Sequence, residues 1–359
     1  MSQVDSESTG GDKGTKTELV TGMASWWGGF SSSPRGRLIS LFTVAVVLLM
    51  IPRLIASSYW IRVLDQAGLY IMMALGLNVI VGYAGLMNLG YASFFAIGAY
   101  LWAVLASPQH DIHLPFLLIF PLAGLLSGVV AYILAIPALK LKGDYLALVT
   151  LGFAESIRIL ANNASFTNAA AGIINIDHPS LGVFAVASVR EYYYVVLVLC
   201  AIEILVMRRL ENSRIGMAWM AIREDELAAE SMGLNTRSLK LLACFIGAIP
   251  AGLAGVLFSG MQTFISPVSF KFLESITILS MVVVGGRGNA WGVVMGAFLL
   301  TVLPEPLRGT SLDTARILLY GVLLVVMAIF RPEGIWPRRY GGAKREGGQT
   351  DVCDTTELS

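Results

Sequence analysis

Residues 241–260 read LLACFIGAIPAGLAGVLFSG, a run without a single charged side chain. A helix of about 20 apolar residues is long enough to cross the ~30 Å hydrocarbon core of a bilayer. Ala248, Ala251, Gly252 and Gly255 give this helix a surface of small residues on which a neighbouring helix can pack closely. The stretch therefore predicts a membrane-spanning helix, which we place at 238–260, within a helical bundle.

The whole chain shares this apolar character. Of its 359 residues, 56% are hydrophobic and 14% are charged, and the mean hydropathy is +0.71. An ordinary soluble domain contains about 25% charged residues. The composition therefore excludes a soluble globular protein and makes membrane lipid an expected partner. The formal net charge of +1 argues against nucleic acid as a partner.

Apolar stretches of similar length occur along most of the chain, with Gly and Pro inside several of them, as membrane helices tolerate. We therefore predict an all-α fold, a polytopic transmembrane helical bundle of about ten spans. The predicted spans are 38–57, 60–81, 86–106, 114–138, 145–161, 192–207, 238–260, 272–286, 290–304 and 313–330.

The distribution of basic residues predicts the orientation of these spans. With the N-terminus in the cytoplasm, 18 of the 25 Lys and Arg residues fall on the inner side and seven on the outer side, as the positive-inside rule requires. Both termini are thus expected in the cytoplasm, and the expected location is the inner membrane of a bacterium. The predicted organisation is a disordered cytoplasmic tail at 1–36, a transmembrane domain at 37–335 and a polar cytoplasmic tail at 336–359.

The cytoplasmic loop 208–237 has the pattern of an amphipathic helix. Ile215, Trp219, Ile222, Ala229 and Met232 recur at spacings of three, four or seven residues. One interpretation is an interfacial helix lying on lipid, but such helices carry a basic polar face. Here the polar face is largely acidic, which favours docking in the groove of a protein partner.

The string AIREDELAAESMGLNT (221–236) resembles the coupling loop of ABC importer permeases, in which two alanines are followed four residues later by glycine. It also resembles the permeases of the Liv-type family, which take up branched-chain and other hydrophobic amino acids. Further segments of this chain resemble the same family, in the family's order. They are LGLNVIVGYAGLMNLGYASFFAIGAY (75–100), GDYLALVTLGFAESIR (143–158), MVVVGGRGNAWGVVMGAFLLTVLPEPLR (281–308) and FRPEGI (330–335).

The resemblance implies a subunit of an ATP-driven importer. Its expected partners are a homologous permease subunit, two cytoplasmic ABC ATPase subunits and a periplasmic substrate-binding protein. No cofactor is expected on this chain, and ATP and magnesium would be used by the ATPases. The family's glutamate before the alanines is replaced by Leu227, with Glu226 one position earlier. The residues expected to couple to the ATPase are Arg223, Glu224, Asp225, Glu226, Ala228, Ala229, Glu230 and Gly233.

An outer loop departs from the family pattern. Members of the family often carry Thr-Gly-Gly-x-x-Gly-Ile there, whereas this chain reads FTNAAAGI at 166–173 and keeps only Thr167, Gly172 and Ile173. The missing glycines leave the geometry of this turn open.

Candidate residues of the translocation path cluster near 78–90. Asn78 and Asn88 flank the glycines Gly82, Gly85 and Gly90. One interpretation is a broken or re-entrant segment beside the path, since irregular backbone at membrane depth must line a cavity or be buried in protein. The other is an ordinary tight turn between two helices.

Three further features have a structural interpretation, and the first of them also has a functional alternative. Glu155 and Arg158 share a helix face and are expected to form a structural pair, the alternative being contact with a zwitterionic substrate. Glu203 is expected to face a polar group of another helix. Gly288, Gly292 and Gly296 recur every four residues and predict a packing surface along one helix.

No catalytic or metal-binding constellation is visible. His110 and His113 form an HxxH with only His178 besides, and no clustered ligands accompany them. The string GDKGTKT (11–17) lacks the spacing of a phosphate-binding loop, so ATP hydrolysis is expected in another subunit. A stand-alone secondary transporter or facilitator remains the alternative function, although only one interrupted segment is found where such folds show two.

Overall fold

The structure is a computed structural model that describes residues 49–54, 57–107, 115–141, 143–181, 184–185, 188–307, 321–322, 325–326 and 334–336. The chain divides into two units, 1–57 and 58–359. Of the first unit only one short helical piece is described, and all that follows concerns the second. The first predicted tail, the second tail beyond residue 336 and most of the spans 38–57 and 313–330 lie outside the described residues, as do His110 and His113.

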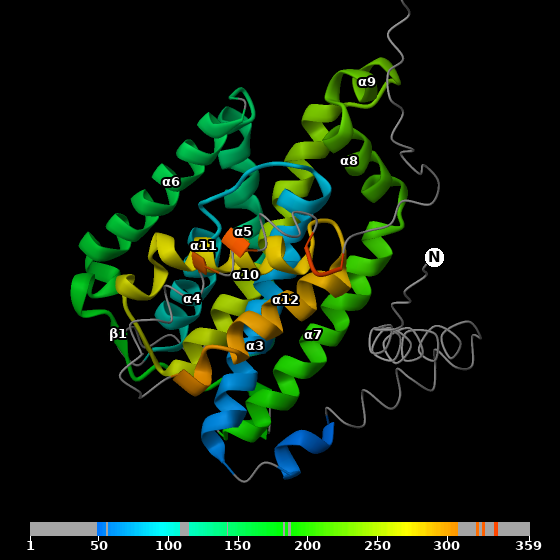
Figure 1. The fold of residues 1–359 in the computed structure, drawn as a ribbon. Helices are drawn as coiled ribbons and strands as arrows, with labels where there is room; N and C mark the ends of the chain where they lie inside the picture. Colours follow the sequence, from blue (N-terminus) through cyan, green and yellow to red (C-terminus); the bar gives the residue numbers. More distant parts are fainter. Residues whose placement is uncertain are drawn as a thin grey trace, which may run out of the picture. The chain divides into compact units, whose positions relative to one another are not determined.

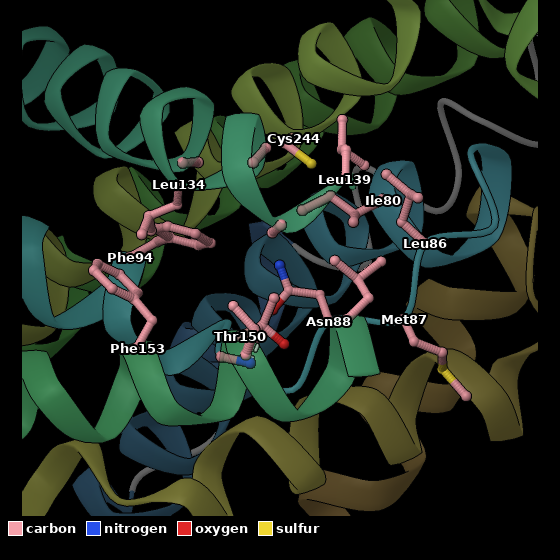
Figure 2. Close-up of a pocket in the computed structure, with 16 residues that line it drawn as sticks. Ile80, Leu86, Met87, Asn88, Phe94, Leu134, Leu139, Thr150, Phe153 and Cys244 are labelled. Atoms are coloured by element: carbon pink, nitrogen blue, oxygen red, sulfur yellow. Dashed lines mark hydrogen bonds between the residues drawn. The ribbon is translucent and has the colours of Figure 1, made fainter. Parts of the chain in front are cut away.

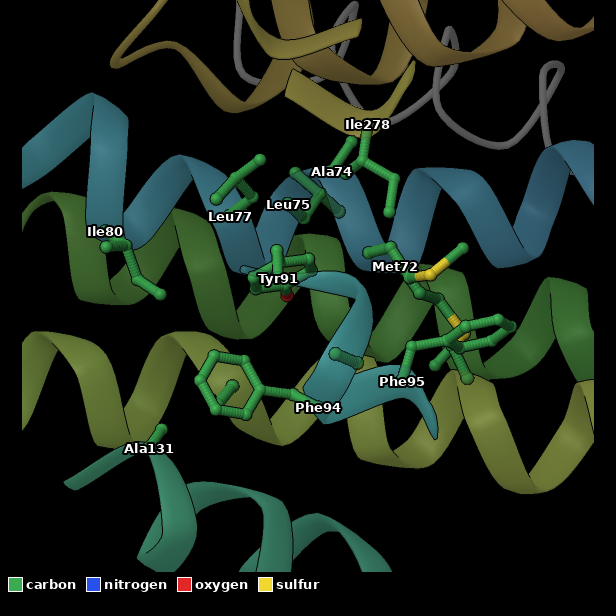
Figure 3. Close-up of a cluster of buried hydrophobic side chains, with 14 of the residues drawn as sticks. Met72, Ala74, Leu75, Leu77, Ile80, Tyr91, Phe94, Phe95, Ala131 and Ile278 are labelled. Carbon is green, nitrogen blue, oxygen red and sulfur yellow. The ribbon is translucent and has the colours of Figure 1, made fainter. Parts of the chain in front are cut away.

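The centre of the second unit is formed by α3 (Ser58–Leu77), α4 (Ala92–Ala106) and α10 (Thr236–Gln262). α10 packs against both of the others and against α5 (Phe116–Ala138) (Figure 1). Large side chains such as Met72, Phe94 and Phe95 fill the space between these helices (Figure 3). The predicted spans 60–81 and 238–260 are thus largely buried inside the protein.

The small-residue surface of α10 lies where predicted and faces α4. A Cβ atom placed on Gly98 would be 2.0 Å from the carbonyl oxygen of Gly252, and one on Gly255 would be 2.2 Å from that of Phe95. Tyr91 adds a hydrogen bond of 2.8 Å from its hydroxyl to the carbonyl oxygen of Gly247. The two backbones therefore approach as closely as glycine permits.

The periphery contains α5, α6 (Asp144–Asn163) and α7 (Val189–Glu211). These helices leave large apolar side chains exposed, among them Leu117, Ile133, Leu148 and Leu205. An exposed apolar helix surface of this kind suits contact with lipid. By length and composition, α3 with its continuation, α5, α6 and α10 are each able to cross a membrane, and α4, α11 (Phe272–Gly285) and α12 (Ala290–Val302) are shorter apolar helices.

α11 and α12 pack on each other through glycines. A Cβ on Gly292 would lie 2.3 Å from the carbonyl oxygen of Gly285, and one on Gly296 would lie 2.5 Å from that of Met281. The prediction of three glycines along one helix face is wrong for Gly288, because it precedes α12 and adopts a φ of +87° in the turn that joins the two helices.

Short elements close the end of the bundle near residues 164–185 and 263–270. They comprise the 3₁₀ turns η3 (Ser165–Thr167), η4 (Ala169–Ala171) and η5 (Pro267–Phe270), and the antiparallel pairs β1 (Ile173–Ile174) with β4 (Phe264–Ile265) and β2 (Ser180–Leu181) with β3 (Phe184–Ala185). A further 3₁₀ turn, η6 (Glu305–Leu307), follows α12.

The loop at 166–173 keeps a glycine-like backbone without the glycines. Asn168 and Ala169 occupy the positions of the family's two glycines and have φ values of +59° and +49°. The Asn168 side chain donates a hydrogen bond of 2.9 Å to the carbonyl oxygen of Gly172. Asn tolerates the left-handed region, whereas Ala is strained there.

Candidate functional site: the coupling helices and the interrupted segment

The loop predicted at 208–237 contains two helices, α8 (Arg214–Glu224) and α9 (Glu226–Ser231), and not the single helix that we predicted. Asp225 separates them with an extended backbone, and its carboxylate accepts hydrogen bonds from the amides of Leu227 and Ala228 at 2.9 and 3.0 Å. An aspartate is among the best residues for starting a helix in this way. We call α8 and α9 together the coupling helices.

Gly233 ends α9 as the sequence predicted. Its φ is +84°, and the amide of Leu234 bonds back to the carbonyl oxygen of Ala229 at 3.1 Å. This is the hydrogen-bond pattern of a glycine-terminated helix. Asn235 then accepts a bond of 3.1 Å from the amide of Ser238 and begins α10.

One face of the coupling helices is anchored to α10. Trp219 is fully buried and donates through Nε1 to the carbonyl oxygen of Leu239 at 2.7 Å. Lys240 forms an ion pair of 2.5 Å with Glu226, and the hydroxyl of Thr236 donates to Glu230 at 2.6 Å. Two of the acidic residues predicted for coupling therefore attach α9 to the first turn of α10.

The opposite face is exposed and mixed in character. Leu227 is 74% exposed and Met232 84%, and Glu224 and Ala228 are exposed beside them. The prediction that Met232 lies on the buried face with Trp219 and Ile222 is wrong, because Met232 comes after the last turn of α9 and points away from the core. This exposed face therefore carries both apolar and acidic side chains.

Arg223 connects the coupling helices to the interior. Its Nη1 donates a hydrogen bond of 2.5 Å to the carbonyl oxygen of Gly82. Gly82 belongs to η1 (Asn78–Tyr83), a π-helical turn that continues α3. A Cβ on Gly85 would lie 2.9 Å from Cγ of Arg223, so the absence of a side chain at Gly85 leaves room for the arginine stem.

The turn between α11 and α12 also lies beside Arg223 and η1. The side-chain oxygen of Asn78 accepts a bond of 2.9 Å from the amide of Gly288. A Cβ on Gly288 would lie 3.2 Å from Nη1 of Arg223. Arg223 was predicted for coupling, Asn78 and Gly82 for the translocation path, and Gly288 for helix packing. The structure brings these residues together around the guanidinium group of Arg223.

Residues 84–91 form the interrupted segment, which has no helix and is mostly buried. Side chains supply the partners that its backbone lacks. The amide of Leu89 donates to Oγ1 of Thr150 at 3.1 Å, and that of Gly90 donates to Asn88 at 2.8 Å. The neighbouring amide of Ala92 donates to Oγ of Ser275 at 2.9 Å.

The segment is longer than an ordinary tight turn and forms buried irregular backbone between η1 and α4. It also explains why α4 begins at Ala92, six residues later than the predicted start of that span at 86. Buried irregular backbone at membrane depth is tolerated only where other protein groups or a cavity satisfy it. The side-chain partners on α6 and α11 meet that condition.

A narrow cavity lies beside the interrupted segment (Figure 2). It has a volume of about 40 Å³, and Phe94, Leu134 and Phe153 contribute to its apolar wall, with Asn88 and Thr150 on one side. Of the residues predicted for the translocation path, Asn88 lines this cavity, and Asn78, Gly82 and Gly85 lie near Arg223 instead. A space of this volume holds about one water molecule.

Glu155 and Arg158 form the predicted ion pair on α6. Nε of Arg158 donates to both carboxylate oxygens of Glu155 at 2.9 and 3.0 Å. The Glu155 side chain is 43% exposed and the Arg158 side chain 26%. Neither residue lines the cavity of Figure 2, so the described geometry is that of a structural pair at the periphery.

Comparison with known proteins identifies the family of this chain. Residues 59–327 match the family described as branched-chain amino acid transport system / permease component. The chain belongs to this permease family. It is 41% identical over 305 residues to the high-affinity branched-chain amino acid transport system permease protein LivM of Salmonella typhimurium, covering 78% of this chain and 71% of the relative.

Two relatives from Escherichia coli complete the comparison. The LivM protein is 39% identical over 322 residues, covering 83% of this chain and 75% of the relative. The LivH permease protein is 26% identical over 287 residues, covering 75% of this chain and 91% of the relative. No solved structure matches the chain. As a permease component the protein is not an enzyme, and its apolar helices are those of a multi-pass membrane protein.

Two carboxylates of this permease are buried inside helices, Asp65 on α3 and Glu203 on α7. Both oxygens of Asp65 on α3 and both of Glu203 on α7 lack a hydrogen-bond partner among the described residues. No described residue forms a hydrogen bond with the Glu203 carboxylate, so its polar partner on another helix stays a prediction. Asp65 was missed, although a lone aspartate inside an apolar span is itself a signal.

Metal binding has no structural support in the described part of the permease. Its His, Cys, Asp and Glu side chains form no group of three or more that could hold a metal ion.

Proposed function

We propose that this chain is the transmembrane permease subunit of an ATP-driven ABC importer. It translocates branched-chain and other hydrophobic amino acids that a periplasmic binding protein delivers. Its partners are a homologous permease subunit, two cytoplasmic ATPase subunits and the binding protein, and its location is the inner membrane of a bacterium with both termini in the cytoplasm. ATP and magnesium are bound by the ATPases.

The observation that carries the proposal is the construction of the coupling helices. They are fixed to the interior by Arg223 and Trp219, yet they present Leu227 and Met232 to the outside. Lipid is a poor match for this surface, because Glu224 lies beside the apolar residues and anionic headgroups repel acidic groups. A groove on a soluble ATPase is a better match.

The relatives support the remaining parts of the proposal. Escherichia coli has two similar proteins, LivM and LivH, both named as permease proteins of a high-affinity branched-chain amino acid transport system. A system with two homologous permeases supports a second permease subunit beside this one. The substrate class is proposed from the same names.

The test is reconstitution of the tagged chain with the subunits that co-purify from native membranes. Vesicles loaded with ATP and magnesium are mixed with binding protein and radiolabelled L-leucine, and a protonophore is added to remove any ion gradient. We expect accumulation that needs ATP and survives the protonophore. Uptake that needs no ATP but collapses with the protonophore would refute the proposal in favour of a secondary transporter.

A further inference from the structure

A larger cavity lies at the end of the permease opposite to the coupling helices. α10 begins at Thr236 beside α9 and ends at Gln262, so its length of 27 residues separates the two ends by about 40 Å. The cavity has a volume of about 220 Å³ and lies between the second half of α10, α3, α4, η5 and the first turn of α11. In the proposed orientation it is on the periplasmic side.

The cavity contains a carboxylate with no countercharge. Glu274, in the first turn of α11, is half-buried and accepts a hydrogen bond of 3.0 Å from the hydroxyl of Tyr70. Among the described residues it forms no ion pair. An ionisable group inside a membrane protein is costly unless it is paired or has a function. An ammonium group on a ligand would provide the missing partner.

The wall of the cavity is aromatic and aliphatic. The rings of Phe95 and Phe258 have centroids 5.1 Å apart, and Phe270 packs on Phe95 at 5.3 Å from behind. Leu69 and Met73 from α3 extend the apolar lining. This surface matches a branched aliphatic side chain, which gains by leaving water.

The rim supplies hydrogen-bond donors. Gln66 and Gln262 contribute side-chain amides, and Ser269 contributes a hydroxyl. These groups match a carboxylate without requiring a buried cation. The volume corresponds to about seven water molecules, which is the scale of a small aliphatic amino acid.

A second cavity lies beside this one. It has a volume of about 330 Å³, shares Gln262 with the first cavity, and is lined by Arg62 and His178. Arg62 precedes Gln66 by one helical turn on α3. The two cavities are therefore consecutive along the same helix, with basic groups in one and the Glu274 carboxylate in the other.

We infer that the cavity around Glu274 is a transit site for a free α-amino acid with an aliphatic side chain. Glu274 binds the ammonium group, Phe95 and Phe258 contact the side chain, and the amides of the rim face the carboxylate. The inference rests on the proposed function for its substrate class, and it adds the residues that hold the substrate inside the permease.

The experiment measures protection of a cysteine placed in the cavity. Ser269→Cys is introduced together with Cys353→Ser, because Cys200 and Cys244 are buried and react slowly. The assembled complex in nanodiscs, without ATP or binding protein, is alkylated with a maleimide at increasing concentrations of L-leucine. The alkylation rate should fall about tenfold when L-leucine reaches ten times its Kd.

Two comparisons make the result specific. 4-Methylpentanoate, which is leucine without its amino group, should not protect the cysteine. Glu274→Gln should raise the Kd of L-leucine about tenfold to a hundredfold, Glu274→Asp should restore part of the affinity, and Lys271→Gln, a change outside the cavity lining, should leave it unaltered. Equal protection by both ligands, unchanged protection in Glu274→Gln, or no protection by L-leucine would each overturn the inference.

The outcome is separable from that of the proposed function, since the labelling needs neither ATP nor the binding protein. ATP-driven uptake without protection would remove only the transit site. Protection together with ATP-independent uptake would keep the site and remove the importer.

Discussion

Arg223 and Gly82 are 141 positions apart in the sequence, yet a 2.5 Å hydrogen bond joins the guanidinium group of one to the backbone carbonyl of the other. The acceptor lies in a π-helical turn, a form that recurs at functional sites because it displaces backbone groups from their usual register. A displacement of α8 should therefore also displace the backbone of η1, which continues α3. This bond joins the coupling helices to the turn that precedes the interrupted segment.

Replacing Arg223 should uncouple ATP hydrolysis from transport. Arg223→Ala removes the bond to Gly82, and Arg223→Lys keeps the charge but loses the planar donor set. Because the residue is exposed at its edge, we expect a loss of only about 1 kcal/mol in stability. Stimulation of ATPase activity by loaded binding protein should fall sharply in both variants, as measured in proteoliposomes. Arg237→Ala, an exposed arginine in the first turn of α10, is the matched control and should behave as wild type.

Gly233 should tolerate side chains according to backbone preference and not according to size. A Cβ at this position meets nothing within 4 Å, but the φ of +84° is unfavourable for most residues. Gly233→Val should therefore disrupt the end of α9 at a cost of about 1–2 kcal/mol, whereas Gly233→Asn should cost less. Substrate-stimulated ATPase activity, with membrane insertion as a second readout, checks the order. Equal activity of the Val variant and wild type would show that the geometry of this turn does not matter for coupling.

The contact between α4 and α10 should be among the least tolerant sites in the permease. Gly98→Ala places a methyl group against the backbone of Gly252, which cannot move aside as a side chain can. We expect a loss of about 1–3 kcal/mol in stability. Gly152→Ala on α6 is the control, because nothing lies within 4 Å of its Cβ, and it should be neutral or stabilising by about 0.5–1 kcal/mol. Thermal unfolding of the two purified variants in one detergent makes the comparison.

The loop at 166–173 offers two alanine-to-glycine substitutions with opposite expected effects on stability. Ala169 has a φ of +49°, so Ala169→Gly relieves backbone strain and should raise stability by about 0.5 kcal/mol after the entropy of glycine is subtracted. Ala171 is not left-handed, so Ala171→Gly should lower stability by about 0.5–1 kcal/mol. Melting temperatures of both variants test this, and a shift of the same sign in both would contradict the account.

The sequence allowed the helices to be predicted well where hydrophobic length alone decides them. The predicted spans 145–161 and 238–260 correspond to α6 and α10 with ends displaced by only a few residues. The prediction was less successful where polar side chains compete with the helix. Asp225 divides the coupling region by capping a new helix, and the backbone of 84–91 leaves helical form because Thr150 and Ser275, distant in sequence, satisfy its amides.

The candidate site was predictable in its parts but not in its assembly. The motif around Ala228 and Gly233 indicated the coupling helices, and the asparagines and glycines near 82 indicated irregular backbone. Nothing in one sequence indicates that Arg223 reaches Gly82, because that distance depends on how α8 packs against α10. Glu274 was missed for a similar reason, since its significance comes from Phe95 and Phe258 on other helices.

The burial of Trp219 against the start of α10 has a mechanical consequence. The rigid indole of Trp219 holds the start of α10, so a rotation of the indole rotates the helix with it. α10 also contains Pro250 near its middle, where the missing backbone donor makes bending easier. A rotation of about 5° at the Trp219 end would sweep the far end, about 40 Å away, through about 3–4 Å. That sweep is about the width of a methylene chain, enough to open or close a space bounded by Phe258 and Gln262 without unfolding any helix.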